Sequence, residues 1–286
     1  MTFAADLVTE LERATAGRPI PRVRTLHLPP AEAAASKNGE FCALELDDGA
    51  LGISYVLLDD TLQRLIDAPD RGGIVGMDAL ALAREFAAPP PAGAGRAEIE
   101  ACDLRRTLGF AAANALSRTV MDRMGFAPPR ATDSIGGIDP QAGDHVGMVG
   151  LFSPLLKQVT AAGARLTVIE LNPDYAGHYD GYRVTLDAAE LEGCNKVLST
   201  STILLNHSVD RILAHCRGAE RIVLIGPSAG CLPDPLFARG VTVVGGSWIL
   251  ERQGFIDALR RGESWSAFAY KFALGAADWP GPASIR

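Results

Sequence analysis

Residues able to bind a ligand recur at five points in the second half of the chain, each after a short apolar run. The runs have the length of buried strands, and ligands bind beyond the carboxyl ends of strands in an open parallel sheet. The pattern therefore predicts one shared ligand site. The candidates are Gly147, Gly150, Phe152 and Ser153 after the first run, Glu170 and Asn172 after the second, Thr200, Ser201, Thr202 and Asn206 after the third, Gly226, Pro227 and Ser228 after the fourth, and Gly245-Gly246-Ser247 after the fifth.

The first point, residues 145–156, has the pattern of a strand, a glycine turn and a helix. Gly147 and Gly150 allow the backbone to pass close to a ligand, and Ser153 is predicted to cap the helix, with Pro154 in its first turn. Backbone N–H groups at such a helix start suit an anion. The complete Gly-x-Gly-x-x-Gly pattern is absent, so the turn alone does not predict a dinucleotide.

Glu170 lies about twenty residues beyond Gly150, where dinucleotide-binding folds place an acid that binds a ribose hydroxyl. An acid also occurs at a strand end because it faces water, and the sequence leaves both interpretations open. The side chains at 200–206 can hydrogen-bond an oxyanion or a hydroxylated ligand, whereas Thr202 is equally suited to cap the following helix.

A metal site requires converging His, Cys, Asp or Glu side chains. His207 and Cys231 both follow predicted strand ends and are the candidates for a transition-metal ion. Their spacing matches no zinc signature. A hydrolase with a Ser-His-Asp or Cys-His arrangement is not expected.

The elements that position these residues fall into two predicted parts. The first part is a small α+β unit at 1–125, the second an α/β unit at 144–286, and the segment 126–143, rich in Pro and Gly, is the predicted linker. In the first part we expect helices at 3–16, 60–67, 76–87 and 97–124 (the last broken near Gly109), a strand at 22–28, and a hairpin of strands 41–46 and 51–57.

After the linker, strands and helices alternate at short spacing. We expect strands at 145–151, 165–171, 196–199, 221–225 and 241–244, and helices at 154–162, 187–191, 203–216 and 254–261. This alternation predicts a parallel sheet with right-handed crossovers, a Rossmann-like layer.

Composition limits the classes of partner. The net charge is −7, so the chain lacks the basic surface that nucleic acid requires. No apolar run approaches about eighteen residues, so no membrane-spanning helix is expected. The first residues predict an amphipathic helix rather than a signal peptide, and five scattered cysteines without Cys-x-x-Cys fit a reducing cytoplasm with buried thiols.

Several stretches resemble the DUF364 family, which carries a heavy-metal chelation label, together with its usual N-terminal partner DUF4213, an enolase N-terminal-like unit. The stretches in the second part are Gly147–Pro154, Val168–Pro173, Ser201–Asn206, Ile225–Phe237 and Gly240–Ser247, and those in the first part are Asp47–Gly49, Gly52–Tyr55 and Gly109–Leu116. The resemblance implies an enolase N-terminal-like domain followed by a Rossmann-like domain, with the site in the cleft between them.

The same resemblance implies that Asn114 and Asn206, which match family asparagines, face that cleft. The sequence departs from the family pattern at His207, where a small residue is expected, and at Ser199-Thr-Ser-Thr, which replaces a Thr-Gly-Thr-like turn.

Two functions remain in view. The first is a protein that binds a metal ion or a metal-containing small molecule in the cleft. The alternative is a Rossmann-type enzyme that uses a nucleotide or S-adenosylmethionine, held by Gly147, Gly150 and Glu170. The sequence leaves open whether the chain catalyses a reaction and whether it forms a homo-oligomer.

Overall fold

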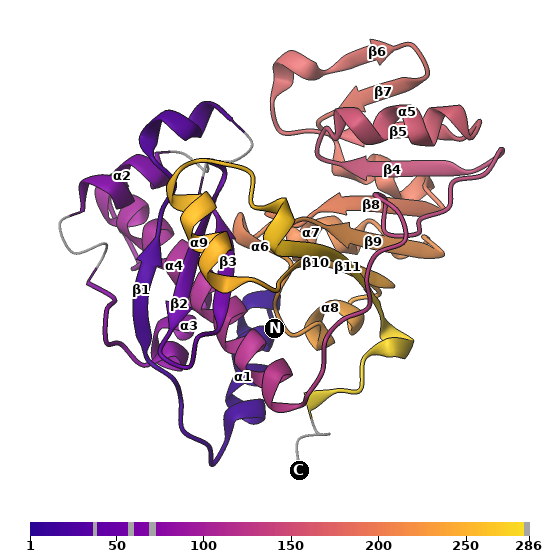
Figure 1. Cartoon of the computed structure of the whole chain (residues 1–286). Helices are drawn as coiled ribbons and strands as arrows, with labels where there is room; N and C mark the ends of the chain where they lie inside the picture. The colour runs from indigo at the N-terminus through magenta and orange to yellow at the C-terminus, as the bar shows by residue number, and fades with distance from the viewer. Residues whose placement is uncertain (37–38, 57–59, 69–72, 283–286) are drawn as a thin grey trace.

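Two sheets of different size organise the chain, the smaller in its first part and the larger in its second (Figure 1). The computed structural model describes residues 1–36, 39–56, 60–68 and 73–282. The small antiparallel sheet contains β1 (Val23–His27), β2 (Phe41–Leu46) and β3 (Leu51–Tyr55). The predicted β2–β3 hairpin is confirmed, with Ala43 opposite Ile53. Leu57, the predicted end of the second hairpin strand, lies outside the described residues.

One face of this small sheet is covered by α4 (Arg96–Arg123), which packs against β2 and β3. Helices α1 (Phe3–Thr15) and α3 (Ala79–Ala87) pack on α4, and α2 (Thr61–Asp67) contacts the 3₁₀ turn Ala31–Ala35. The predicted break of the long helix near Gly109 is wrong, because α4 runs through it without interruption. A Cβ at Gly109 would lie 2.5 Å from the backbone nitrogen of Phe86. The glycine therefore permits close packing of α3 against α4, and that packing outweighs its weak helix propensity.

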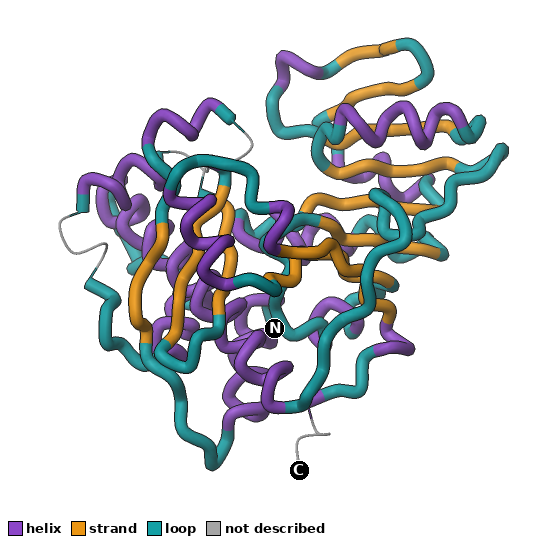
Figure 2. Tube along the Cα trace, viewed as in Figure 1, coloured by secondary structure: helices purple, strands orange, loops and turns teal. Residues whose placement is uncertain are grey.

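The other face of the small sheet is covered by α9 (Arg252–Arg260), a helix that the sequence assigns to the second part. Phe41, Ala43, Leu51 and Ile53 of the sheet share one apolar cluster with Phe255, Ile256 and Leu259 of α9. Figure 1 shows α9 crossing in front of the small sheet, and Figure 2 shows helices on both of its faces. The two parts of the chain are therefore joined through packed side chains as well as through the linker.

The large sheet has the strand order β11-β10-β9-β8-β4-β5-β7-β6. Its strands are β4 (His145–Val149), β5 (Arg165–Ile169), β6 (Gly177–Tyr179), β7 (Tyr182–Thr185), β8 (Lys196–Thr200), β9 (Arg221–Ile225), β10 (Val243–Ile249) and β11 (Ala269–Gly275). All neighbours from β7 through β10 are parallel, and the edge strands β6 and β11 are antiparallel. The predicted parallel sheet is present, whereas β6, β7 and β11 were not predicted.

Helices α5 (Ser153–Ala161), α6 (Thr202–Leu205), α7 (Val209–Ala214) and α8 (Asp234–Phe237) connect these strands. Three predictions here are wrong. The helix expected at 203–216 is two helices, interrupted where His207 takes a left-handed φ of 56°. Gly245 and Gly246 lie inside β10 rather than after it. Ser153 does not cap α5, since the first helical carbonyl, which accepts from Leu155 and Leu156, belongs to Phe152.

The segment 126–143, the predicted linker, has no helix or strand of its own and lies against the large sheet. Ile135 and Ile138 are buried in the same apolar cluster as Val146, Met148 and Leu198. The segment 126–143 therefore contributes residues to the apolar core beside the large sheet. Within the described part of the chain, no helix is both long and apolar enough to cross a membrane.

Replacement of Gly52 by alanine should test the contact between β3 and α4. A Cβ at this position would lie 2.1 Å from the carbonyl oxygen of Ala111 and 2.3 Å from the nitrogen of Ala115, both of them backbone atoms that cannot move independently. Gly52→Ala is expected to lower the free energy of unfolding by about 3 kcal/mol or more, measured by urea denaturation.

Gly218→Ala is the matched control, because a Cβ there would meet only the carbonyl oxygen of Glu192, at an ordinary 3.7 Å. Equal stability of the two variants would contradict this account of the β3–α4 contact.

Candidate functional site

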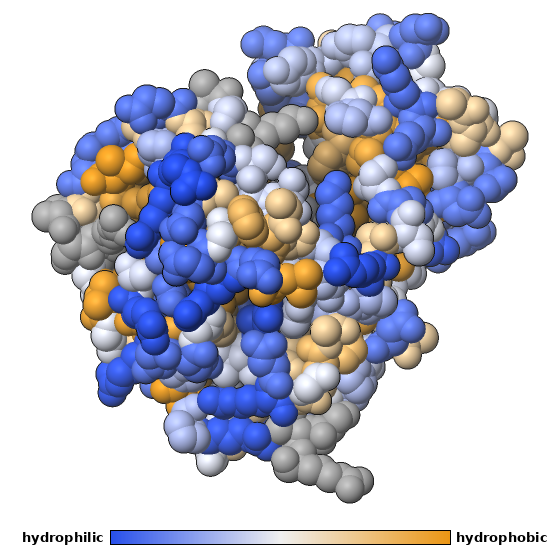
Figure 3. All heavy atoms as spheres, in the orientation of Figure 1, coloured by the Kyte–Doolittle hydropathy of each residue, from blue (hydrophilic) through white to orange (hydrophobic). Residues whose placement is uncertain are grey.

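A pocket of about 830 Å³ lies at the carboxyl edge of the large sheet. Residues that follow β4, β5, β8 and β9 line it, together with the middle of β10 and the loop around Asp133. Glu40 and Tyr55 of the first part complete the wall, so both parts of the chain contribute. Figure 3 shows the surface hollowed between the two units, with hydrophobic residues on the side of the large sheet.

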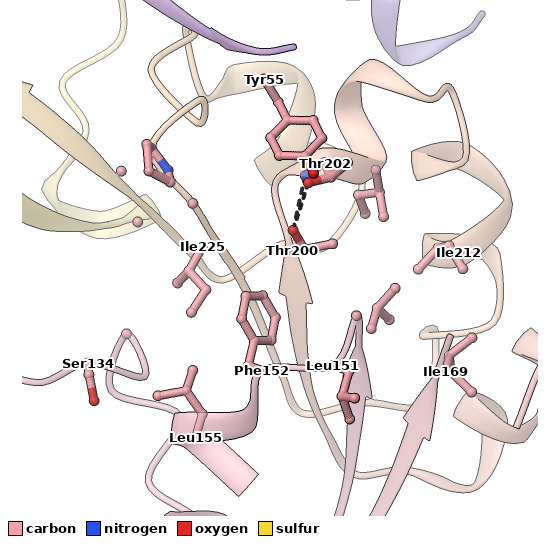
Figure 4. Close-up of a pocket in the computed structure, with 18 of the residues that line it drawn as sticks. Tyr55, Ser134, Leu151, Phe152, Leu155, Ile169, Thr200, Thr202, Ile212 and Ile225 are labelled. Carbon is pink, nitrogen blue, oxygen red and sulfur yellow. Dashed lines mark hydrogen bonds between the residues drawn. The ribbon is translucent and has the colours of Figure 1, made fainter. Parts of the chain in front are cut away.

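The interior of the pocket is mainly apolar. Phe152, at the start of α5, lies near the centre of the close-up, between Ile225 on one side and Leu151 on the other, with Tyr55 beyond Thr202 (Figure 4). Other apolar residues of the lining are Val149, Leu155, Ile169, Leu171, Leu186, Ile203, Ile212 and Phe272. Such a lining, with a few polar groups among it, is typical of sites for organic ligands.

Many of the predicted site residues meet in this pocket. Nine of them come from four different strand ends, as the parallel-sheet argument requires: Gly150, Phe152, Ser153, Glu170, Thr200, Thr202, Asn206, Gly226 and Pro227. Gly245, Gly246 and Ser247 also line the pocket, from the middle of β10.

Two predicted residues have local structural roles instead. Gly147 lies within β4, where a Cβ would be 2.5 Å from a side-chain carbon of Leu191. It makes room for the 3₁₀ turn at Ala188–Gly193. The side chain of Asn172 accepts a hydrogen bond from the backbone N–H of Asp174 at 2.9 Å and caps the 3₁₀ turn Pro173–Tyr175.

Asn114, Ser201 and Ser228 form a buried polar layer beneath the pocket. The hydroxyls of Ser201 and Ser228 are hydrogen-bonded at 2.9 Å. The amide nitrogen of Asn114 donates to the carbonyl oxygen of Ile53 at 2.7 Å and to that of Ser228 at 2.9 Å. These contacts fix the turn after β9 against α4 and β3, so the three residues support the pocket wall from behind.

The stretch Gly226-Pro-Ser228-Ala-Gly230 has the Gly-x-Ser-x-Gly spacing found at the nucleophile of many hydrolases. Its serine does not have the required setting. Ser228 is 1% exposed and its hydroxyl is paired with Ser201. Its φ is also not positive, since the described non-glycine residues with positive φ are Asp139 and His207. The turn at Ser228 therefore does not present the nucleophile of such a hydrolase.

Glu170 bends back onto the glycine turn after β4. Its carboxylate accepts the backbone N–H of Leu151 at 3.0 Å through Oε2 and that of Leu171 at 2.7 Å through Oε1. Gly150, at a φ of +87°, donates its own N–H to Ile169 at 2.9 Å. The acid thus lies at the turn itself.

The hydroxyl residues after β8 arrange one another. Thr200 accepts the backbone N–H of Thr202 at 3.2 Å, and the hydroxyl of Thr200 donates to that of Thr202 at 3.1 Å (Figure 4). The expectation that Thr202 caps the next helix is wrong, since α6 starts without a side-chain cap. Asn206 accepts both the N–H and the hydroxyl of Ser208, at 3.1 and 2.6 Å, and so holds the break between α6 and α7.

The two metal candidates lie in different surroundings. The ring of His207 stacks on Phe86 with centroids 5.4 Å apart, and burial lowers its pKa to about 4. Cys231 lines a separate small cavity of about 30 Å³, and burial raises its pKa to about 12, which keeps the thiol protonated and a poor metal ligand. Among all described residues, no three His, Cys, Asp or Glu side chains gather as a metal centre requires.

Several lining residues were not found from the sequence. Arg211 on α7 and Lys271 on β11 bring positive charge to the pocket, and Asp133, Ser134 and Gln158 bring polar groups. Lys271 was missed because β11 was not predicted. Asp133 and Ser134 were missed because 126–143 was interpreted as a linker only.

Three comparisons bear on this geometry. Residues 135–276 match the model of the DUF364 family, described as "Putative heavy-metal chelation". The chain is similar to a DUF364-family protein of unknown function from Pyrococcus horikoshii, with a TM-score of 0.67 at 15% identity over 96% of this chain and 100% of the other. A second such protein, from Desulfitobacterium hafniense DCB-2, gives a TM-score of 0.63 at 15% identity over 95% and 98%.

No curated protein sequence matches the chain. The two solved structures share its fold across both parts, since each alignment covers nearly all of both chains. Their identity is too low to transfer more than the fold. The family match is more specific, and its bounds enclose every strand of the large sheet together with four of the strand ends that line the pocket. Residues 135–276 of this chain therefore form a DUF364 domain.

Proposed function

We propose that the chain binds an organic small molecule that carries a metal ion, in the pocket at the carboxyl edge of the large sheet. The observation that carries the proposal is the size and lining of that pocket, about 830 Å³ with mainly apolar walls. This volume suits an organic ligand of some tens of atoms, whereas a bare ion needs a compact cage of polar side chains.

The family description, heavy-metal chelation, supports the presence of a metal ion in the ligand. The side chains of the pocket favour a metal ion that is already bound to an organic chelator. Because the described residues contain no three-residue cluster of metal ligands, most donor atoms must come from the organic molecule. The protein then supplies shape, apolar contact and a few orienting groups. Glu170, Arg211 and Lys271 are the charged residues that we assign to this role.

We further propose that the two parts are a Rossmann-like domain and an enolase N-terminal-like, DUF4213-like domain. The strand order β7-β5-β4-β8-β9-β10 supports the first assignment, because it is the 3-2-1-4-5-6 order of dinucleotide-binding sheets. We base the second assignment on the antiparallel sheet of the first part, whose β2–β3 hairpin is followed in the chain by α2, α3 and the long helix α4.

An enzyme that uses S-adenosylmethionine or a nucleotide is the second candidate. The strand order favours this candidate specifically. Strands β5 and β7 lie on one side of β4, and β8, β9 and β10 lie on the other side, so the order of the strands reverses between β4 and β8. The pocket lies at this switch point, where such cofactors bind.

Ligand analysis of the purified protein tests the first candidate against the second. Protein prepared without chelator or affinity tag is expected to release one metal ion together with one organic molecule, detected by native mass spectrometry and elemental analysis. An adenine-containing ligand without metal would contradict the proposal and favour the enzyme.

Leu186→Glu should reduce this occupancy at least tenfold, because it places a carboxylate in an apolar wall of the pocket. Leu250→Glu is the matched control, since Leu250 is 56% exposed, against 49% for Leu186, and lies outside the pocket lining. Comparable loss in both variants would mean that the ligand binds elsewhere.

Substitution of the two sequence-based metal candidates provides a separate test. His207→Ala and Cys231→Ala are expected to keep the full metal content, because one ring is stacked on Phe86 and the other side chain is a buried, protonated thiol. Elemental analysis gives the metal content, and circular dichroism controls for the fold. Stoichiometric loss of metal from either folded variant would restore a protein-built metal site.

A further inference from the structure

We propose that the carboxylate of Glu170 takes the place at the β4–α5 turn where a phosphate would otherwise bind. The pocket then selects ligands that present a hydroxyl or ammonium group, rather than a phosphate, to this turn. The inference rests on the pocket being the ligand site, as proposed above, and it names the chemical class of the ligand.

The first support is the state of the backbone donors at the turn. A helix start after a glycine turn binds phosphate through uncommitted N–H groups. Here the N–H of Gly150 donates to Ile169 at 2.9 Å, and that of Leu151 donates to Glu170 at 3.0 Å. Pro154, within the first turn of α5, has no N–H to offer. The donors that a phosphate would need are therefore reduced in number.

The second support is the charge that the acid places there. Both carboxylate oxygens of Glu170 are fixed by main-chain N–H groups, since Oε1 accepts from Leu171 at 2.7 Å. Among the described residues, no Arg, Lys or His forms an ion pair with this carboxylate. Apolar residues of the pocket, Leu151 and Phe152, adjoin the turn and limit the screening of its charge by water. A ligand phosphate at the turn would therefore meet this negative charge directly, since Arg211 and Lys271 line the pocket without pairing with Glu170.

The third support is the bonding capacity that remains. Each carboxylate oxygen can accept more than one hydrogen bond, and each uses one on the backbone. Because Glu170 lines the pocket, the remaining lone pairs are available to a donor on the ligand. The acid that in dinucleotide sites binds a ribose hydroxyl thus keeps this ability, while it removes the neighbouring phosphate site.

The test uses pyrophosphate as the probe, in calorimetric titrations of the whole chain at low ionic strength. The wild-type protein is expected to bind pyrophosphate weakly or not at all. Glu170→Ala releases the N–H of Leu151 and removes the charge, so its affinity for pyrophosphate should rise at least tenfold. Glu170→Gln removes the charge but still occupies the space, and should give a smaller rise.

Glu220→Ala is the control for a general change of protein charge, because Glu220 is exposed and lies outside the pocket lining. The inference is overturned if wild type binds pyrophosphate as tightly as Glu170→Ala, or if Glu220→Ala gains as much. If Glu170→Ala does not fold, as judged by circular dichroism, Glu170→Gln is compared with wild type instead. The inference is then overturned if wild type binds pyrophosphate as tightly as Glu170→Gln.

Phosphorus analysis of the ligand released from wild-type protein separates this inference from the proposed function. A phosphorus-free ligand with metal supports both. A metal-bearing ligand whose phosphate binds at the turn overturns the inference alone, and a phosphorus-free ligand without metal overturns the metal proposal alone.

Discussion

The pocket depends on the buried contact between α4 and the turn after β9. Asn114 of α4 donates one amide to Ile53 of the small sheet and to Ser228 beside the large sheet. Ser117, one turn further along, accepts the backbone N–H of Leu232 at 3.0 Å. Loss of such a side chain leaves buried backbone groups without partners, at about 1–3 kcal/mol for each. Both units are thus positioned by the same face of one helix.

The rest of the fold reinforces this connection. Helix α9 returns from the second part to cover the small sheet, and Arg252 at its start reaches Glu45 at 3.1 Å. A second connection is made by the guanidinium of Arg239, which pairs with the carboxylate of Asp6 in α1 at 2.6 Å and with that of Asp210 in α7 at 2.7 Å. One apolar cluster runs from Phe3 to Leu274 through both units. A pocket walled by such a continuous core is formed before the ligand arrives, which lowers the entropic cost of binding.

The sequence predicted which strand ends line the pocket better than what each residue does there. Apolar runs and their following polar residues located four strand ends to within two residues. Because parallel strands place those ends at one edge, the residues after them meet in one pocket. The surroundings of a residue, however, depend on neighbours that are distant in the chain, and the sequence does not show which residues these are. Gly147 and Gly150 are the same residue type, yet they have different surroundings. Gly147 lies against Leu191 and Cys194, whereas Gly150 lies beside Thr200 in the pocket lining. The break at His207 was missed for the same reason, since stacking on Phe86 is a tertiary contact.

The chemistry of the site follows from which charges the fold buries and which it leaves at the pocket. Cys231 is a buried, protonated thiol, and His207 is a half-buried neutral ring stacked on Phe86, so these two candidate ligands serve packing rather than metal binding. The polar groups of the pocket lining are hydroxyls, amides, the carboxylates of Glu40, Asp133 and Glu170, and the cations of Arg211 and Lys271. These groups bind organic functional groups better than soft metal ions. A metal in this pocket would therefore need to bring its own coordination, which is why we propose that the protein binds a metal-carrying organic molecule rather than a bare ion.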